Sequence, residues 1–159
     1  MRNILGPLGS SDNTEHTVLY AIDLAATTQA AIFVMDSFNP SFSNAHLLNV
    51  KEVVNRNNFN RLKALIKSID HQGLSIQMVN YEGDFLEGVN ALDQKVALDL
   101  IVCGPMPNSN SDEVFLGPTS GRLAKKTDIP VWIVPEGTLF QAPKKALFAF
   151  KQGMVEGER

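Results

Sequence analysis

The residues with the clearest potential to bind a ligand lie between positions 99 and 135. An apolar run, Leu100–Cys103, opens at Gly104 into a polar loop, and Gly117 ends that loop before a short helical segment. A glycine-bounded loop between a strand and a helix is a common phosphate-binding layout, because loop amides and a helix N-terminus both attract anions. The spacing therefore points to anion binding.

The composition of this loop argues against a working phosphate site. The loop begins Pro105, Met106, Pro107, Asn108. Proline lacks an amide hydrogen and fixes its own φ, so it neither donates to a phosphate nor lets the backbone adapt to one. We expect a scaffold of the nucleotide-binding type from which the binding chemistry is missing.

Catalytic and metal-binding side chains occur, but without the spacing of a site. Ser10, Ser11, Asp12 and His16 have the residue types of a hydrolase triad, yet all lie at the start of one helix, where capping explains them better. The three histidines show no metal-ligand spacing with one another or with Cys103, which ends an apolar strand and is expected to be buried. We therefore expect no bound metal and no catalytic turnover.

The composition indicates one globular domain without a basic surface. The chain has 159 residues, of which 44% are hydrophobic and 19% charged, and its net charge is -3. Such a balance excludes a basic stripe for nucleic acid. The single cysteine rules out an internal disulfide and favours a reducing compartment, and neither a secretion signal nor a membrane-spanning run is visible, so we expect a cytoplasmic protein.

Alternating strands and helices account for the length of the chain. Short apolar runs bounded by glycine, proline or capping residues predict strands at 3–8, 30–37, 74–80, 100–103 and 131–134. Apolar residues at helical spacing predict helices at 13–28, 45–71, 85–96 and 118–126, and Asp84 with Glu87 has capping-box spacing at the third. This order predicts a parallel sheet with helices on both faces.

Four segments, taken together in their order, resemble the universal stress protein family: Ile4–Pro7, Tyr20–Ala25, Asp99–Gly104 and Ile129–Pro135. The likeness runs over about residues 2–136. It implies a Rossmann-like, three-layer α/β/α sandwich of the adenine nucleotide α-hydrolase-like superfamily, with a five-stranded parallel sheet of strand order 3-2-1-4-5. The expected division is a universal stress protein-like domain at 1–136 followed by a segment at 137–159.

The same resemblance supplies an ATP-binding pattern from which this chain departs. Members that bind ATP carry an acidic residue just after the first strand and a loop of the form glycine, two residues, glycine, nine residues, glycine, then serine or threonine. Here Gly104 and Gly117 match, but the acidic position is Gly9, the second glycine is Pro107 and the hydroxyl position is Pro118. The resemblance therefore implies the branch of the family that lacks ATP and acts as a binding or scaffold module in the stress response.

Two alternatives use the same crevice. In the first, an ATP-binding protein with weak hydrolysis forms a reshaped phosphate site from Gly104, Gly117, Thr119 and Ser120. In the second, the crevice holds a less charged small molecule. The first alternative must tolerate Pro107 and Pro118.

The last predicted strand is the expected interaction surface. The implied strand order places Val131, Trp132, Ile133 and Val134 at the edge of the sheet, and an uncovered apolar edge can pair with another chain. The family commonly dimerises through this strand, so we expect a homodimer or pairing with a second unit of the same kind. The simpler alternative is an edge strand covered by its own tail.

The residues after Pro135 resemble the beginning of a second unit. Residues 136–143 have the composition of a linker, and 144–150 repeat the basic start and apolar run of residues 2–8. We interpret the chain as the first unit of a tandem protein. The alternative is an ordinary tail whose aromatic side chains pack on the core.

Overall fold

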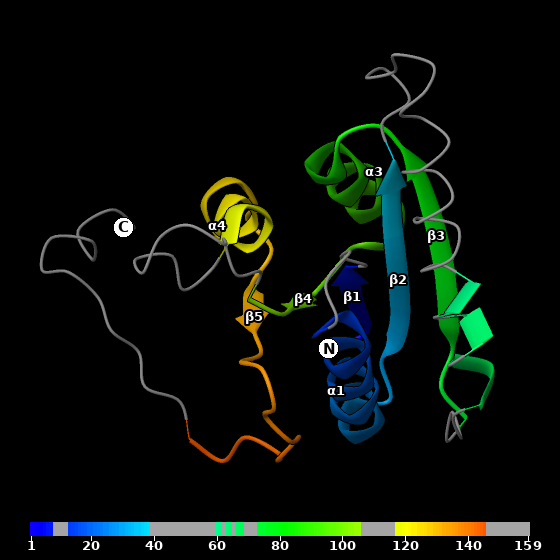
Figure 1. Ribbon diagram of the computed structural model, residues 1–159, viewed down its shortest axis with the longest axis vertical. Helices are drawn as coiled ribbons and strands as arrows, with labels where there is room; N and C mark the ends of the chain where they lie inside the picture. Colours follow the sequence, from blue (N-terminus) through cyan, green and yellow to red (C-terminus); the bar gives the residue numbers. More distant parts are fainter. Residues whose placement is uncertain are drawn as a thin grey trace, which may run out of the picture.

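Five parallel strands form one sheet with helices on both of its sides (Figure 1). The computed structural model describes residues 1–7, 13–38, 60–61, 63–64, 66–68, 73–105 and 117–145. In chain order the elements are β1 (Asn3–Pro7), α1 (Asn13–Thr28), β2 (Ala31–Phe38), β3 (Ile76–Glu82), α3 (Phe85–Val96), β4 (Leu100–Cys103), α4 (Gly117–Lys126) and β5 (Val131–Ile133).

The strand order is β3-β2-β1-β4-β5, and every pair is parallel. In the centre of the sheet, Leu5 of β1 lies opposite Phe33 of β2 on one side and Ile101 of β4 on the other. The central strands read as continuous apolar runs because both of their faces are covered. The expected order 3-2-1-4-5 and the Rossmann-like α/β class are confirmed.

Side chains from alternate strand positions build two separate cores, because successive residues of a strand point to opposite faces. One face carries Ile4, Ile32 and Val102, which pack with the apolar side of α1. We call this side the α1 face. Ile66, in the helical residues 66–68, packs into the same core.

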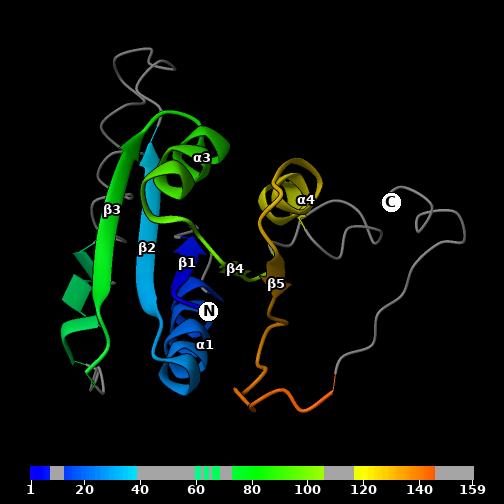
Figure 2. The same ribbon diagram turned by 180° about the vertical axis from the view of Figure 1, so that it is seen from behind.

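The opposite face is covered by α3 and α4, and we call it the α3/α4 face (Figure 2). Leu5 and Ile101 point into this core, where they meet Val89 of α3 and Leu123 of α4. Both helices begin near the carboxyl ends of the strands: α3 follows β3 closely, and Ser120 in the first turn of α4 contacts Gly104 at the end of β4. That placement puts their N-termini at the edge where open α/β sheets bind ligands.

Most predicted elements lie at or close to their expected positions. The helices at 13–28 and 85–96 and the strand at 100–103 are confirmed to the residue. The third strand lies two residues further along than predicted, because its ladder with β2 continues until Glu82 stands opposite Phe38. Of the helix predicted at 45–71, residues 45–59, 62, 65 and 69–71 lie outside the described part of the chain, and the described residues between 60 and 68 are helical.

Polar contacts tie the start of β1 to the start of β4. The Asp99 carboxylate accepts hydrogen bonds from the backbone amides of Arg2 and Asn3, and the Asn3 side chain donates to the carbonyls of Val96 and Ala97. The two amides hold the pKa of Asp99 below its ordinary value. These contacts hold the starts of β1 and β4 together. The strand order of the sheet reverses its direction between these two strands.

Candidate functional site

The candidate site is the carboxyl edge of the sheet between β1 and β4. The chain leaves β1 toward α1 and leaves β4 toward α4, and these helices lie on opposite faces. Such a reversal separates the two connections and opens a crevice between them. Gly9 and Pro107, on which part of the ATP argument depends, lie outside the described residues.

Two of the four predicted phosphate-site residues meet at this edge. Ser120 lies in the first turn of α4, is 2% exposed, and donates its hydroxyl hydrogen to the carbonyl oxygen of Gly104 over 2.8 Å. The contact joins the end of β4 to α4. A buried hydroxyl with its hydrogen committed to a backbone carbonyl has no free donor for a phosphate.

Gly117 and Pro118 form the start of α4. The first amides of a helix have no partner within it and are the groups that attract anions. Pro118 has no amide hydrogen, so the N-terminus of α4 offers one backbone donor fewer than a helix with any other residue at that position. The backbone of Thr119 follows in the same turn, and its side chain lies outside the described residues.

Cys103 is buried at the end of β4, as predicted. Burial raises the pKa of its thiol. The thiolate is the reactive form of cysteine, so this raised pKa keeps the side chain inert near neutral pH.

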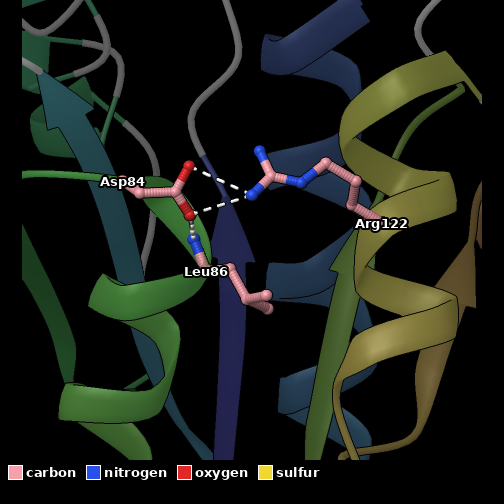
Figure 3. Close-up of polar contacts among 3 residues, drawn as sticks. All are labelled: Asp84, Leu86 and Arg122. Atoms are coloured by element: carbon pink, nitrogen blue, oxygen red, sulfur yellow. Dashed lines mark hydrogen bonds and ion pairs between the residues drawn. The ribbon is translucent and has the colours of Figure 1, made fainter.

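An ion pair crosses from α3 to α4 at the same edge (Figure 3). The Nη2 atom of Arg122 lies 3.1 Å from each carboxylate oxygen of Asp84. Asp84 is also the N-cap of α3, because its Oδ1 accepts a hydrogen bond of 2.9 Å from the Leu86 amide. One carboxylate therefore caps one helix and holds the side chain of the other.

The surroundings of Asp84 favour its charged form. Desolvation raises its pKa, but the Leu86 amide and the Arg122 guanidinium outweigh it and hold the pKa below 3.8. Both partners are more than one-third exposed, at 38% for Asp84 and 51% for Arg122. Exposed pairs of this kind contribute little to the free energy of folding.

A small cleft lies beside this ion pair. Its lining residues are Phe85, Leu86, Arg122 and Leu123, and its volume is about 30 Å³. Such a space suits one or two water molecules, far less than the several hundred Å³ of a typical small-molecule site. This cleft does not hold a nucleotide.

Two titratable side chains lie on the α1 side of the structure. His16, near the start of α1, is half-buried, and its Nε2 atom is buried with no hydrogen-bond partner in the described part of the chain. Asp36 has the strand parity of Ile32 and Val34, which places it on the α1 face. Burial raises the pKa of Asp36, with the Ser37 amide acting in the opposite direction. Among the described residues, no three histidine, cysteine, aspartate or glutamate side chains cluster closely enough to hold a metal ion.

The predicted pairing edge has a defined set of free backbone groups. The Pro130 carbonyl accepts from the Ile101 amide and the Val134 amide donates to Cys103, so alternate residues 130, 132 and 134 face β4. The backbone groups of Val131 and Ile133 consequently point away from β4. No described strand lies on that side of β5.

Neighbouring residues limit this free edge to a short stretch. The Ile129 amide donates to the Thr127 hydroxyl, Pro135 has no amide hydrogen, and the Pro135 carbonyl accepts from Thr138. Proline and short length are common protections of edge strands. The side chains differ from the backbone: Val131, Trp132 and Ile133 are half-buried against the two cores, and Val134 is 1% exposed. The edge surface is therefore chiefly backbone, and Val134 is a core residue.

The comparisons with known proteins agree with this architecture. The sequence model of the universal stress protein family matches residues 1–135. The chain belongs to this family. A search among curated proteins gives no significant match. None of the described helices is long and apolar enough to span a bilayer.

Several solved structures, universal stress proteins among them, share the fold at low sequence identity. A universal stress protein from Lactobacillus plantarum is 18% identical with a TM-score of 0.65, and the match covers 84% of this chain and 97% of that one. A universal stress protein solved in complex with cAMP is 22% identical with a TM-score of 0.59, over 84% and 96% of the two chains. A functionally unknown Pseudomonas aeruginosa protein is 16% identical with a TM-score of 0.62, and the match covers 84% of this chain but 47% of that one.

Capping-box spacing in the sequence identifies Asp84 as a cap but does not indicate its partner Arg122. The Asp84–Arg122 pair could in principle be predicted from the sequence together with the strand order. The implied strand order places the N-termini of α3 and α4 on the same face at the same edge, so a carboxylate at one and a cation at the other can meet. Periodicity and capping rules treat each helix separately and do not reveal such a pair.

Proposed function

We propose that this universal stress protein unit is a non-catalytic binding or scaffold module of the cytoplasmic stress response, which does not bind ATP and pairs with a second such unit through β5. The observation that carries the first half is the Ser120–Gly104 hydrogen bond. It places a predicted phosphate-binding hydroxyl in the core, with its hydrogen donated to the backbone. Pro118 in the first turn of α4 supports the same conclusion.

The β5 edge supports the second half of the proposal. Val131 and Ile133 present backbone donors and acceptors that no described strand uses. A second copy can satisfy them by adding its own edge strand. The neighbour of which this chain covers 47% has room for a second unit of this size, which supports the tandem interpretation.

Calorimetric titration tests the absence of ATP binding. Protein purified without added nucleotide is titrated with ATP and magnesium, and the dissolved protein is also analysed by mass spectrometry for carried-over nucleotide. We expect no binding heat at micromolar protein and no adenine compound. Micromolar affinity for ATP would overturn this part of the proposal.

A proline substitution tests pairing at the edge. Ile133→Pro removes an amide hydrogen that points away from β4, so the sheet can keep its own ladder while the edge loses a donor. Ile133→Ala is the matched control, because it removes the same side chain but keeps the amide. We expect pairing measured by sedimentation to be lost in the proline variant only; equal pairing in both would contradict the β5 interface.

The alternative is an ATP-binding protein with weak hydrolysis that uses Gly104, Gly117, Thr119 and Ser120. One observation favours it: Gly104 and the first turn of α4 do come together at the carboxyl edge. The neighbour solved with cAMP shows that one protein of this fold has been crystallised with an adenine nucleotide. Titration with cAMP beside ATP separates this alternative from the proposed module, which we expect to bind neither.

A further inference from the structure

The chain turns back onto the α1 face directly after β5. Val134 is buried, and the Thr138 amide donates to the Pro135 carbonyl over 3.2 Å. Gly137, third in this four-residue turn, has φ of +71°, a conformation that glycine adopts without strain. Two residues after the turn, the Phe140 ring meets Tyr20 of α1.

The contact between these two rings is specific. Their centroids are 5.2 Å apart and their planes are inclined by 80°, the edge-to-face arrangement that aromatic pairs prefer. Phe140 is half-buried against the α1-face core, whereas Leu139 is 80% exposed and Gln141 is exposed. Only Phe140 in this stretch is directed into the core, so the segment is anchored at one point.

Trp132 packs against the same core from β5. β5 has three residues and a partner strand on one side only among the described strands. Short edge strands fray easily, because few hydrogen bonds hold them. Anchoring the chain immediately after β5 limits that fraying, since Phe140 fixes the end from which the strand would open.

We propose that residues 135–140 form a strap which belongs to the domain, and that Phe140, seated on Tyr20, positions β5 for pairing with a second unit. This inference rests on the pairing proposed above. Phe140 is a positioning residue: it does not belong to the pairing edge and acts through the order of Val131 and Ile133. An ordered edge binds a partner strand more tightly, because less conformational entropy is lost on association.

The test compares Phe140→Ala with Leu139→Ala in the full chain. Trp132 is the single tryptophan, so its emission reports on the α1-face core without labelling. In Phe140→Ala we expect a red shift of this emission and faster exchange of the Ile101 and Val134 amides, which donate across the β4–β5 ladder, both measured at dilutions where the units are separate. At higher concentration we expect pairing about tenfold weaker, which corresponds to about 1.4 kcal/mol.

Leu139→Ala removes an exposed side chain of the same strap and should change neither the emission nor the exchange. Phe140→Leu restores apolar volume and should recover much of both signals. Such a recovery would show that the effect of Phe140→Ala comes from the lost packing on Tyr20 and not from general unfolding. Unchanged Trp132 emission in Phe140→Ala would overturn the strap. A shifted emission with unchanged pairing would overturn the positioning role.

A failure of the proposed function gives a different result. If the wild-type chain shows no pairing at any concentration, pairing through β5 is wrong and so is the positioning role of Phe140. The Trp132 emission and the amide exchange of the separate units still show whether the strap packs on the α1-face core.

Discussion

The two faces of the sheet are closed by contacts of different physical kinds. On the α1 face, the Phe140 ring packs on Tyr20, and on the α3/α4 face the Asp84 carboxylate holds the Arg122 guanidinium. Burial of an aromatic ring gives a stabilisation that changes little with salt or moderate pH. An exposed ion pair contributes less and is weakened by both salt and acid. We therefore expect the salt dependence of stability to come chiefly from the α3/α4 face.

Two carboxylates sharpen the same contrast. Asp36 on the α1 face has a raised pKa because of burial, whereas the Leu86 amide and Arg122 give Asp84 a lowered one. The charged form is thus disfavoured on one face and favoured on the other. Substitutions on the two faces therefore separate apolar from charged contributions to stability.

Gly88→Ala should destabilise the protein by about 1–3 kcal/mol, the usual cost of overpacking. A Cβ at this position in α3 would lie 2.8 Å from ring atoms of Tyr81. Urea unfolding measures the effect. Gly121→Ala in α4 is the control, because a Cβ there meets nothing within 4 Å, and it should stabilise by up to about 1 kcal/mol. Equal effects of the two substitutions would show that the Tyr81–α3 contact is loose.

Asp84→Ala should cost about 1 kcal/mol, because α3 loses its N-cap and Arg122 loses its partner. Asp84→Asn keeps an oxygen that accepts from Leu86 and should cost less. Thermal unfolding of the two variants separates capping from charge. Equal losses in the two variants would mean that the ion pair outweighs the cap.

Asp36→Asn should stabilise the protein at pH 7 and have little effect in acid. The folded-state pKa of Asp36 is raised above its ordinary value of 3.8, so below pH 3.8 the carboxyl group is protonated and its burial costs no stability. This stability is lost as pH rises through the folded-state pKa and the buried group becomes charged. Asparagine removes that loss. Asp23→Asn, at an exposed position of α1, is the control. A gain that persists at low pH would assign the effect to a cause other than charge burial.

Arg122→Gln should have the smallest effect, at most about 1 kcal/mol at low salt, and the difference from wild type should shrink as salt is added. The contribution of Asp84 has its own pH dependence. Since the folded-state pKa of Asp84 is lowered, the stabilisation by its charged form is present above pH 3.8 and is lost as pH falls through the folded-state pKa. In Arg122→Gln this acid loss should be smaller, and an unchanged profile would show that the Leu86 amide alone lowers the pKa.

Local patterns predicted the elements well because they depend on nearby residues. Helical spacing gave α1, and Asp84 marked the start of α3, since a capping side chain bonds to amides of its own turn. The burial of Cys103 followed from its place at the end of an apolar run. The strand order came from the resemblance to a family, because periodicity does not say which strands are neighbours.

The sequence by itself determined which segments are strands and helices, which of their sides are apolar, and that prolines stand where a phosphate loop needs free amides. Only the tertiary structure decided that Ser120 donates to Gly104, that Arg122 reaches Asp84, and that Phe140 returns to Tyr20. The physical reason is distance along the chain. Such contacts join elements that meet only after the sheet has set their order and twist, so no local propensity encodes them.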